Sequence, residues 1–434
     1  INNATLAGVT AIIATGNSGP NRGTIGNPAS SAFAISVGNS TVPELHLAAN
    51  LTVEAGEYSN TVTVPMFGWR YQADPRDVFT GEYELVAVPG VGKPADFQGI
   101  DVEGKVVLIS RGEIPFVDKI AAAKEAGAIG TIIHNNAPGA GPANLFLSTD
   151  FGFIPTFDMS TADGAALRTA LGSGVGTVTI NDYTATTTAG DDVNSSSSRG
   201  PTSPTFDIKP DVVAPGTNIM AAVPAYKRDF PDADYEFAYG RKTGTSMATP
   251  HVAGVAALIK EINPDWNPFD IKVAISNTAK QLDVNKYDVF SQGPGRIQPF
   301  QAAFPEALAY SYDTTQFQGA THENVKGTVT FGKVEPDSSE AQQVTKQVVV
   351  KNMGGSASDF DVTVQVTKAG SGAMSGATVD VDVDSFTLTN EQTLNVTLNV
   401  PAGTGTPGNE MLGYIHIQSE TSKLILPFAV EFSG

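Results

Sequence analysis

The sequence feature that most constrains the fold is the stretch 244–262, GTSMATPHVAGVAALIKEI. Its apolar spacing predicts a helix that ends at Asn263, just before a proline. Small residues such as Ala253 and Gly254 let this helix lie close to neighbouring strands. A short apolar strand pattern, DVVAPG at 211–216, precedes it. This part of the chain is therefore predicted to be an α/β layer.

A second region shows the pattern of a separate, smaller α/β unit. Apolar strands are predicted at 105–110 and 130–136, with a helix at 116–128 between them and another at 162–171. These elements can bury one another, so we expect them to form their own core, outside the sheet that contains the strand predicted at Val9–Ala14. A polar run of Thr, Ser, Asp and Gly then indicates a boundary near 184–201.

The last third of the chain is predicted to be all-β, beginning near residue 311. Its strands alternate between apolar and polar residues and are separated by Gly, Ser and Asn, which is typical of a β-sandwich. The predicted strands are 342–352, 360–369, 377–388, 392–401 and 411–419.

Composition excludes several classes of function. The chain of 434 residues has 26 Lys and Arg against 45 Asp and Glu, a net charge of −19, so its field repels nucleic acids and anionic membranes. Cysteine is absent, which excludes disulfides, thiolate metal sites and a cysteine nucleophile. No apolar run approaches the roughly 18 residues of a membrane span.

Two polar residues lie at positions where α/β proteins commonly have their active-site residues. Ser246 is at the start of the predicted helix, where its Oγ lies near the positive end of the helix dipole and its N–H has no partner within the helix. Asn17 follows the first predicted strand, and ligand sites lie beyond the carboxyl ends of such strands. Its amide can donate to an oxygen that is becoming negative. A helix cap for Ser246 and a turn for Asn17 are the plainer alternatives.

These residues resemble the subtilisin family of serine endopeptidases (subtilases). Residues 244–248, with Pro250 and Gly254, match the family's nucleophile motif, and residues 14–17 match its oxyanion segment. Residues 198–201 and 209–216 match the stretch that leads to the nucleophile in larger bacterial members.

The resemblance implies a secreted, extracellular enzyme that hydrolyses peptide bonds through an acyl-enzyme on Ser246. Asn17 and the Ser246 N–H would hold the oxyanion. Protein or peptide substrates would contact Ala14, Thr15 and Gly16 along one wall of the specificity pocket, with Gly26 near its base. The chemistry requires no cofactor or metal; structural calcium is conceivable, but the sequence singles out no ligands for it.

The resemblance also divides the chain into four segments. Residues 1–45 would be the first retained part of a subtilisin-like parallel-sheet catalytic core, and residues 187–310 its second part, with the nucleophile. Residues 46–186 would be an inserted α/β protease-associated domain. Residues 311–434 would be a fibronectin type III-like β-sandwich. A cis bond before Pro28 is a further implication of the resemblance.

One departure from the family pattern affects the expected activity. The family's catalytic residues run in the order Asp, His, Ser, so the Asp and His motifs belong upstream of Asn17. Neither motif occurs in the 434 residues. We therefore expect a C-terminal portion that is nearly inert alone and needs an N-terminal segment of the same protease as its partner. A binding or adhesion protein with a relic protease core, and an autolytic fragment held by its N-terminal partner, remain alternatives.

Overall fold

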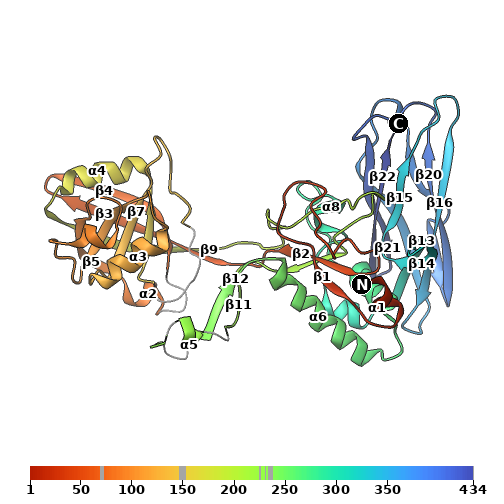
Figure 1. Cartoon of the computed structure of the whole chain (residues 1–434), viewed down its shortest axis with the longest axis horizontal. Coiled ribbons are helices and arrows are strands. Elements are labelled where there is room, and N and C mark those ends of the chain that lie inside the picture. The colour runs from red at the N-terminus through yellow and green to blue at the C-terminus, as the bar shows by residue number, and fades with distance from the viewer. Residues whose placement is uncertain (69–72, 146–152, 224–225, 230, 233–237, 434) are drawn as a thin grey trace. The chain divides into compact units, whose positions relative to one another are not determined.

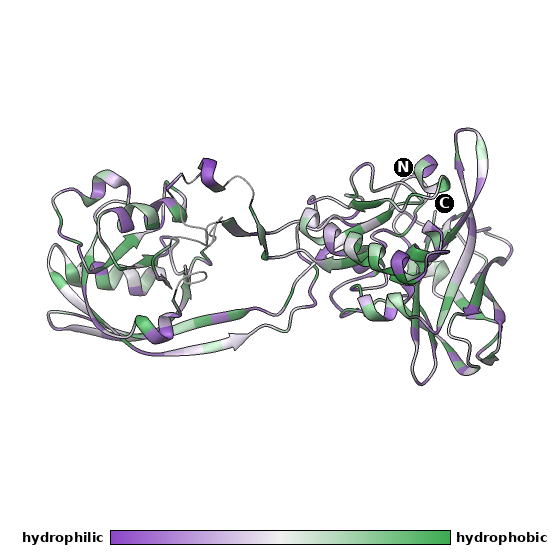
Figure 2. Cartoon of the chain, turned by 90° about the horizontal axis from the view of Figure 1, so that it is seen from below, coloured by the Kyte–Doolittle hydropathy of each residue, from purple (hydrophilic) through white to green (hydrophobic). Residues whose placement is uncertain are grey.

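The chain forms two compact units in the computed structural model, which describes all residues except 69–72, 146–152, 224–225, 230, 233–237 and 434. The core unit comprises Ile1–Val42, Gly190–Ile219 and Thr243–Gly434, and the barrel unit comprises Pro43–Ala189 and Met220–Lys242. Figure 2 shows hydrophobic residues along many of the strands of both units and hydrophilic residues in many of the connecting loops.

The core unit contains a parallel sheet of three strands in the order β1-β2-β10. The strands are β1 (Ile12–Ala14), β2 (Ile35–Ser40) and β10 (Val212–Pro215), and both pairings are parallel. All residues of β2 are buried, whereas those of β1 are half-buried. The first strand starts later than predicted, because α1 (Asn2–Leu6) is followed by Gly8 at φ +97° and by Val9, which is 54% exposed.

Helix α6 (Thr245–Ile262) packs on this sheet, as predicted, with its buried residues Ala248, Val252 and Ala256 facing the strands. It is followed by α7 (Pro268–Asn277), α8 (Val289–Gln292) and α9 (Pro299–Ala303). The start of α7 follows from its sequence: Asn267 Oδ1 accepts from the Asp270 N–H at 2.9 Å, and the Asp270 carboxylate accepts from the Asn267 N–H at 2.9 Å. The mixed α/β class is confirmed.

The barrel unit is built around seven strands that close on themselves in the order β3-β4-β8-β7-β6-β5-β9. They are β3 (Leu45–Ala55), β4 (Tyr58–Phe67), β5 (Gly81–Ala87), β6 (Val106–Ser110), β7 (Gly130–His134), β8 (Thr156–Met159) and β9 (Val175–Thr187). Helices α3 (Phe116–Glu125) and α4 (Thr161–Leu171) pack against them. The two strands predicted around this first helix, β6 and β7, pair within the barrel and not with β1 or β2.

Shorter elements complete the barrel unit. They are α2 (Pro75–Val78), the 3₁₀ turn η1 (Pro94–Phe97), α5 (Tyr226–Asp229) and the paired strands β11 (Ile219–Ala222) and β12 (Tyr239–Lys242), the first residue of β11 belonging to the core unit.

The C-terminal part of the core unit consists of two five-stranded sheets, ordered β14-β13-β16-β20-β18 and β15-β22-β21-β17-β19. Their strands are β13 (Ala307–Phe317), β14 (Ala320–Lys326), β15 (Val329–Val334), β16 (Gln342–Asn352), β17 (Ser358–Lys368), β18 (Thr378–Val381), β19 (Ser385–Leu388), β20 (Glu391–Val400), β21 (Glu410–Gln418) and β22 (Lys423–Phe432), with a 3₁₀ turn η3 at Gly372–Met374. Both sheets contribute to one hydrophobic cluster.

Two boundaries in this part differ from the prediction. The first strand, β13, begins at Ala307, before the expected start at 311. The strand predicted over 377–388 is two strands, β18 and β19, which belong to different sheets. The chain crosses between them at 382–384, where the Asp382 carboxylate accepts from the Asn395 N–H at 2.8 Å and the Asp384 carbonyl accepts from the Val362 N–H at 2.9 Å.

Candidate active site

Ser246 is the second residue of α6, and its residue surface is exposed. The helix start is fixed because the Gly244 N–H donates to the Gly216 carbonyl at 2.8 Å, just after β10. A Cβ atom at Gly216 would lie 2.7 Å from both the Gly244 carbonyl oxygen and Asn39 Oδ1, so only glycine allows this approach. The Met247 N–H bonds to the Gly244 carbonyl at 3.0 Å, whereas the Ser246 N–H has no acceptor in the described part of the chain. The Ser246 N–H is therefore a free donor at the start of α6.

The structure brings Asn17 to the same helix end, 229 positions away from Ser246 in sequence. Asn17 Oδ1 accepts from the Thr245 N–H at 3.0 Å and from the Thr245 hydroxyl at 3.1 Å. Because a backbone N–H can only donate, this contact fixes which end of the amide faces the helix. Asn17 Nδ2 is then the remaining donor, and no described residue accepts from it.

The glycine after β1 allows the Asn17 loop (residues 16–26) to turn close to α6. Gly16 has φ +105°, a conformation that favours glycine, and a Cβ there would lie 3.0 Å from Ser198 Oγ. Its N–H donates to Thr245 Oγ1 at 3.3 Å, and its carbonyl accepts from the Ser198 N–H at 2.9 Å. Thr245 thus contacts both Gly16 and Asn17.

The other residues of the predicted pocket lie next to this loop. Ala14 pairs with Val37 at the end of β1, and Thr15 is fully buried. The Gly26 N–H donates to the Thr15 carbonyl at 2.9 Å, so the predicted wall and base are in direct contact. The bond between Asn27 and Pro28 is cis, as the resemblance implies. Binding of substrate by these residues stays a prediction.

Two supporting residues, Thr245 and Ser198, were not predicted from the sequence. Thr245, 1% exposed, orients the Asn17 amide, and Ser198 Oγ accepts from the Ser18 N–H at 3.0 Å. Both residues lie inside motifs that the sequence analysis quoted, so a signal for them was present. Their partners are more than 170 positions away, which the pattern alone does not indicate.

No histidine hydrogen-bonds to Ser246 within the described residues. On α6 itself, His251 is exposed and its Nδ1 donates to the Met247 carbonyl at 3.0 Å. The partners of the others are Glu44 for His46, Asn135 and Arg168 for His134, Phe317 for His322 and Gln365 for His416. Among the described residues, the predicted nucleophile Ser246 and the predicted oxyanion donor Asn17 thus lie at one helix end, and no imidazole is hydrogen-bonded to the Ser246 hydroxyl.

A buried group of charges supports the sheet on which α6 packs. Asp211, just before β10, accepts from the Ser36 N–H at 2.7 Å and from Lys209 Nζ at 2.7 Å, and Lys272 Nζ lies 3.7 Å away. Burial raises the pKa of Asp211, but the two lysines and the hydrogen bonds outweigh it, so this pKa lies below its ordinary value. Burial lowers the pKa of Lys272 to about 7.

Across residues 1–433 outside the gaps in the description, no group of three or more His, Asp and Glu side chains could hold a metal ion. Over the same residues, no helix is long and apolar enough to cross a membrane.

Comparison with known proteins assigns the family. The profile of the subtilase family (peptidase S8) matches residues 1–295. The chain belongs to the subtilase family. It is 40% identical over 314 residues to the minor extracellular protease Vpr of Bacillus subtilis (strain 168), covering 71% of this chain and 37% of that protein. It is 30% identical over 331 residues to the subtilisin-like protease SBT5.4 of Arabidopsis thaliana, covering 71% and 41%.

Among solved structures, this subtilase is similar to the psychrophilic subtilisin-like protease Apa1 from Pseudoalteromonas sp. AS-11. The two are 19% identical, with 70% of this chain and 65% of that chain covered and a TM-score of 0.26. The chain spans less than half the length of the two curated relatives named above.

Proposed function

We propose that this chain is the nucleophile-bearing, C-terminal portion of a secreted subtilisin-like serine endopeptidase. The observation that carries the proposal is the contact of Asn17 Oδ1 with the Thr245 N–H at 3.0 Å. It fixes the amide so that Asn17 Nδ2 and the Ser246 N–H are both free donors at the start of α6. Two such donors can stabilise an oxyanion on the carbonyl that Ser246 attacks.

The reaction is hydrolysis of a peptide bond through an acyl-enzyme. An imidazole takes the proton of Ser246 Oγ as the oxygen attacks the scissile carbonyl, and the carbonyl oxygen becomes negative. When the C–N bond breaks, the imidazole returns the proton to the leaving amine. Water, activated by the same imidazole, then attacks the ester and releases the acid. Without an adjacent base, the hydroxyl of Ser246 stays a weak nucleophile.

The imidazole and its orienting carboxylate come, in this proposal, from an N-terminal segment of the same protease. Parallel strands are normally buried on both faces, yet β1 is half-buried and has β2 as its one partner in the three-stranded sheet. On α6, the side away from the sheet exposes Leu258 by 54% and Ile262 by 41%. Further strands and helices beside β1 and α6 would cover these apolar surfaces.

The remaining parts of the chain would select substrates or support the core. Residues 46–186 would be a protease-associated domain that restricts which proteins are cut, and residues 311–434 a fibronectin type III-like domain. Ala14, Thr15 and Gly16 would contact the peptide substrate, with Gly26 at the base of the pocket. Secretion is supported by the relative named as an extracellular protease.

The test uses the protease together with the proposed N-terminal segment and a chromogenic peptide. Ser246→Ala is expected to abolish hydrolysis. Asn17→Ala is expected to lower kcat by about 10²–10³-fold, a magnitude that comes from subtilisin itself. Ser18→Ala is the matched control, because Ser18 uses its N–H and not its side chain for the bond to Ser198, and it should keep kcat within about twofold.

Two results would overturn the proposal. Hydrolysis that persists in Ser246→Ala would place the nucleophile elsewhere. A correctly folded assembly with no hydrolysis of any peptide or protein would favour a binding protein with a relic core.

A further inference from the structure

The Asn17 loop is held along one edge mostly by its own backbone, although Thr24 Oγ1 also accepts from the Arg199 N–H at 2.8 Å and the Ser18 N–H donates to Ser198 Oγ at 3.0 Å. Its N–H groups bond to the segment 196–200, with Gly19 donating to the Ser196 carbonyl at 2.9 Å, Gly23 to the Gly200 carbonyl at 3.2 Å and Thr24 to the Arg199 carbonyl at 2.9 Å. Backbone bonds of this kind leave the opposite edge of a loop free to shift unless side chains hold it.

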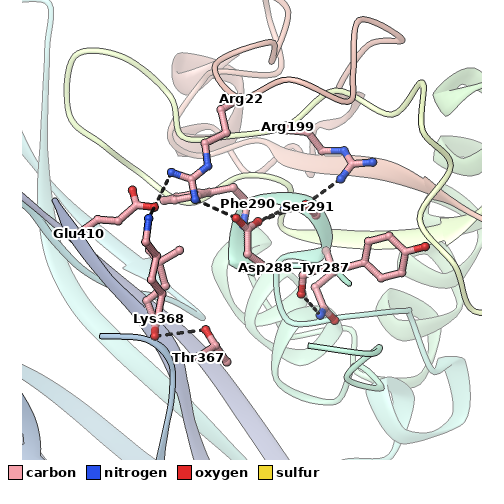
Figure 3. A network of polar contacts seen from close by, with 11 residues as sticks. Arg22, Arg199, Tyr287, Asp288, Phe290, Ser291, Thr367, Lys368 and Glu410 are labelled. Carbon is pink, nitrogen blue, oxygen red and sulfur yellow. Dashed lines mark hydrogen bonds and ion pairs between the residues drawn. The ribbon is translucent and has the colours of Figure 1, made fainter. Parts of the chain in front are cut away.

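Arg22, in the same loop, supplies such a side chain and reaches two carboxylates outside the loop (Figure 3). Its Nη2 lies 2.9 Å from Asp288 Oδ2, and its Nη1 lies 2.5 Å from Glu410 Oε1. The guanidinium carbon lies 5.0 Å above the centre of the Phe290 ring. A planar guanidinium can make these contacts at the same time, which the single ammonium of a lysine cannot do with the same geometry.

The two carboxylates are themselves fixed. Asp288 caps α8, because its Oδ1 accepts from the N–H groups of Phe290 at 2.9 Å and Ser291 at 3.0 Å. Glu410 is 2% exposed at the start of β21 and also accepts from Lys368 Nζ at 2.8 Å. A buried carboxylate is stable only when paired, so Glu410 holds its cations in place.

The surface that carries Glu410 is packed directly against the core helices. Phe290 of α8 lies in one hydrophobic cluster with Tyr414 of β21 and Ile425 of β22. The Tyr414 hydroxyl donates to the Gly293 carbonyl at 3.2 Å. The position of β21 relative to α8 is therefore set by buried contacts, and Arg22 is bonded to both elements.

We propose that Arg22 is a positioning residue for the oxyanion site, and that the C-terminal sheets act on catalysis through Glu410. This inference rests on the proposed function. Arg22 lies five residues from Asn17 in the same loop, and it fixes that loop between α8 and β21. Loss of the bridge would let the Asn17 amide shift from the place where it meets the developing charge, and a displacement of about 1 Å can cost about 10²-fold in rate.

The catalytic test compares Arg22→Gln, Glu410→Gln and Lys368→Gln in the protease with its N-terminal segment. Arg22→Gln is expected to lower kcat about tenfold with little change in KM, because an interaction made in the transition state is weakened. Glu410→Gln should lower kcat in the same direction. Lys368→Gln is the matched control: it removes the other cation of Glu410, is half exposed and does not touch the loop, so kcat should stay within about twofold.

A second variant separates positioning from a general loss of stability. In an Asn17→Ala background, Arg22→Gln should cause no further loss of kcat, because its effect passes through the Asn17 amide. A purely structural role would instead lower kcat by the same factor in both backgrounds. That result, or an unchanged kcat in Arg22→Gln, would overturn the proposal.

Hydrogen exchange tests the same inference without any activity. In the 434-residue chain, Arg22→Gln is expected to speed amide exchange in residues 17–26 by about tenfold or more, while Lys368→Gln leaves it unchanged. Unchanged exchange in Arg22→Gln would contradict the bridge itself. Faster exchange in an assembly that hydrolyses no peptide would leave the bridge intact and refute the proposed function instead.

Discussion

The barrel and the parallel sheet of the core unit differ in whether their outermost strands are paired. In the barrel, each described strand has a partner on both sides, and β6, β7 and β8 are completely buried apart from Ser110. In the core, β2 is the one partner of β1 among the described strands, and β1 is half-buried. Both regions contain short parallel strands packed against helices, but the barrel also has the long antiparallel strands β3, β4 and β9, whose pairing closes it.

In our proposal, this difference marks the surface to which the N-terminal segment of the protease binds. Closure satisfies the backbone groups of every barrel strand internally, whereas the open edge of β1 presents N–H and C=O groups to any strand placed beside it. Strand β1 leads directly to the proposed oxyanion donor Asn17. The exposed apolar residues of α6 lie on the same helix as Ser246. In our proposal, the segment that completes the sheet is therefore also the segment that completes the catalytic site.

The largest expected effect on stability is that of a substitution in the core of the barrel. Phe157 of β8 is completely buried and stacks at 6.0 Å on Phe79, so Phe157→Ala should destabilise the barrel by about 3–5 kcal/mol. Calorimetry should show a lowered melting transition for the barrel with the core transition unchanged. Phe428→Ala, at an equally buried position in β22, is the control and should lower the other transition. If both variants shift the same transition, the two units are not independent.

The second largest effect is a pH dependence of the free energy of unfolding that comes from Lys272 in the core unit. Its pKa is lowered to about 7 by burial, whereas in the unfolded chain it stays near 10.5. Between these values the unfolded state binds more protons, so the free energy of unfolding should rise with pH from about 7 to 9, by up to about 3 kcal/mol. Urea titrations should show this rise in the natural chain and in the exposed control Lys333→Met, but not in Lys272→Met. An equal rise in Lys272→Met would assign it to other groups.

A smaller effect is expected on the open strand. Ile12 of β1 packs against the core cluster but is half-buried, so Ile12→Ala should cost about 1 kcal/mol in this chain. With the N-terminal segment bound, Ile12 would be buried and the cost should rise to about 2–3 kcal/mol, as measured by urea unfolding. An equal cost in both states would mean that no strand covers β1.

The smallest effect on stability is expected at the exposed side of α6. Leu258→Ser should change the free energy of unfolding of this chain by less than about 0.5 kcal/mol, because Leu258 is 54% exposed. The same substitution should weaken binding of the N-terminal segment about tenfold, since apolar surface is no longer buried there. The affinity can be measured by titration calorimetry. A substitution on the outer surface of the barrel, Val175→Ser, should leave it unchanged.

The extent of sequence-based prediction also differs between the two regions. Helix α6 and the strand–helix–strand order of β6, α3 and β7 followed from local patterns, because hydrophobic periodicity is a local property. Closure of the barrel by β3 and β9 was not predicted, since strand pairing over more than 120 positions leaves no local signal.

In the candidate site, too, local patterns identified residues but did not reveal their long-range contacts. Ser246 and Asn17 were found because each lies in a short motif, and the structure places them at one helix end. The contacts of Thr245 with Asn17, of Ser198 with Ser18 and of Arg22 with Glu410 each join segments that are distant in the sequence. A motif can indicate which residues form a site, but it does not indicate which distant side chains hold those residues in position.

The most direct test of the account is labelling of Ser246 by a hydroxyl-reactive phosphonate. The chain is incubated with the probe alone and with the proposed N-terminal segment, and mass spectrometry locates the adduct. Because the hydroxyl needs an imidazole to react, we expect an adduct on Ser246 only when the segment is present, and none in Ser246→Ala. Equal labelling of the chain alone, or no labelling of the assembly, would contradict it.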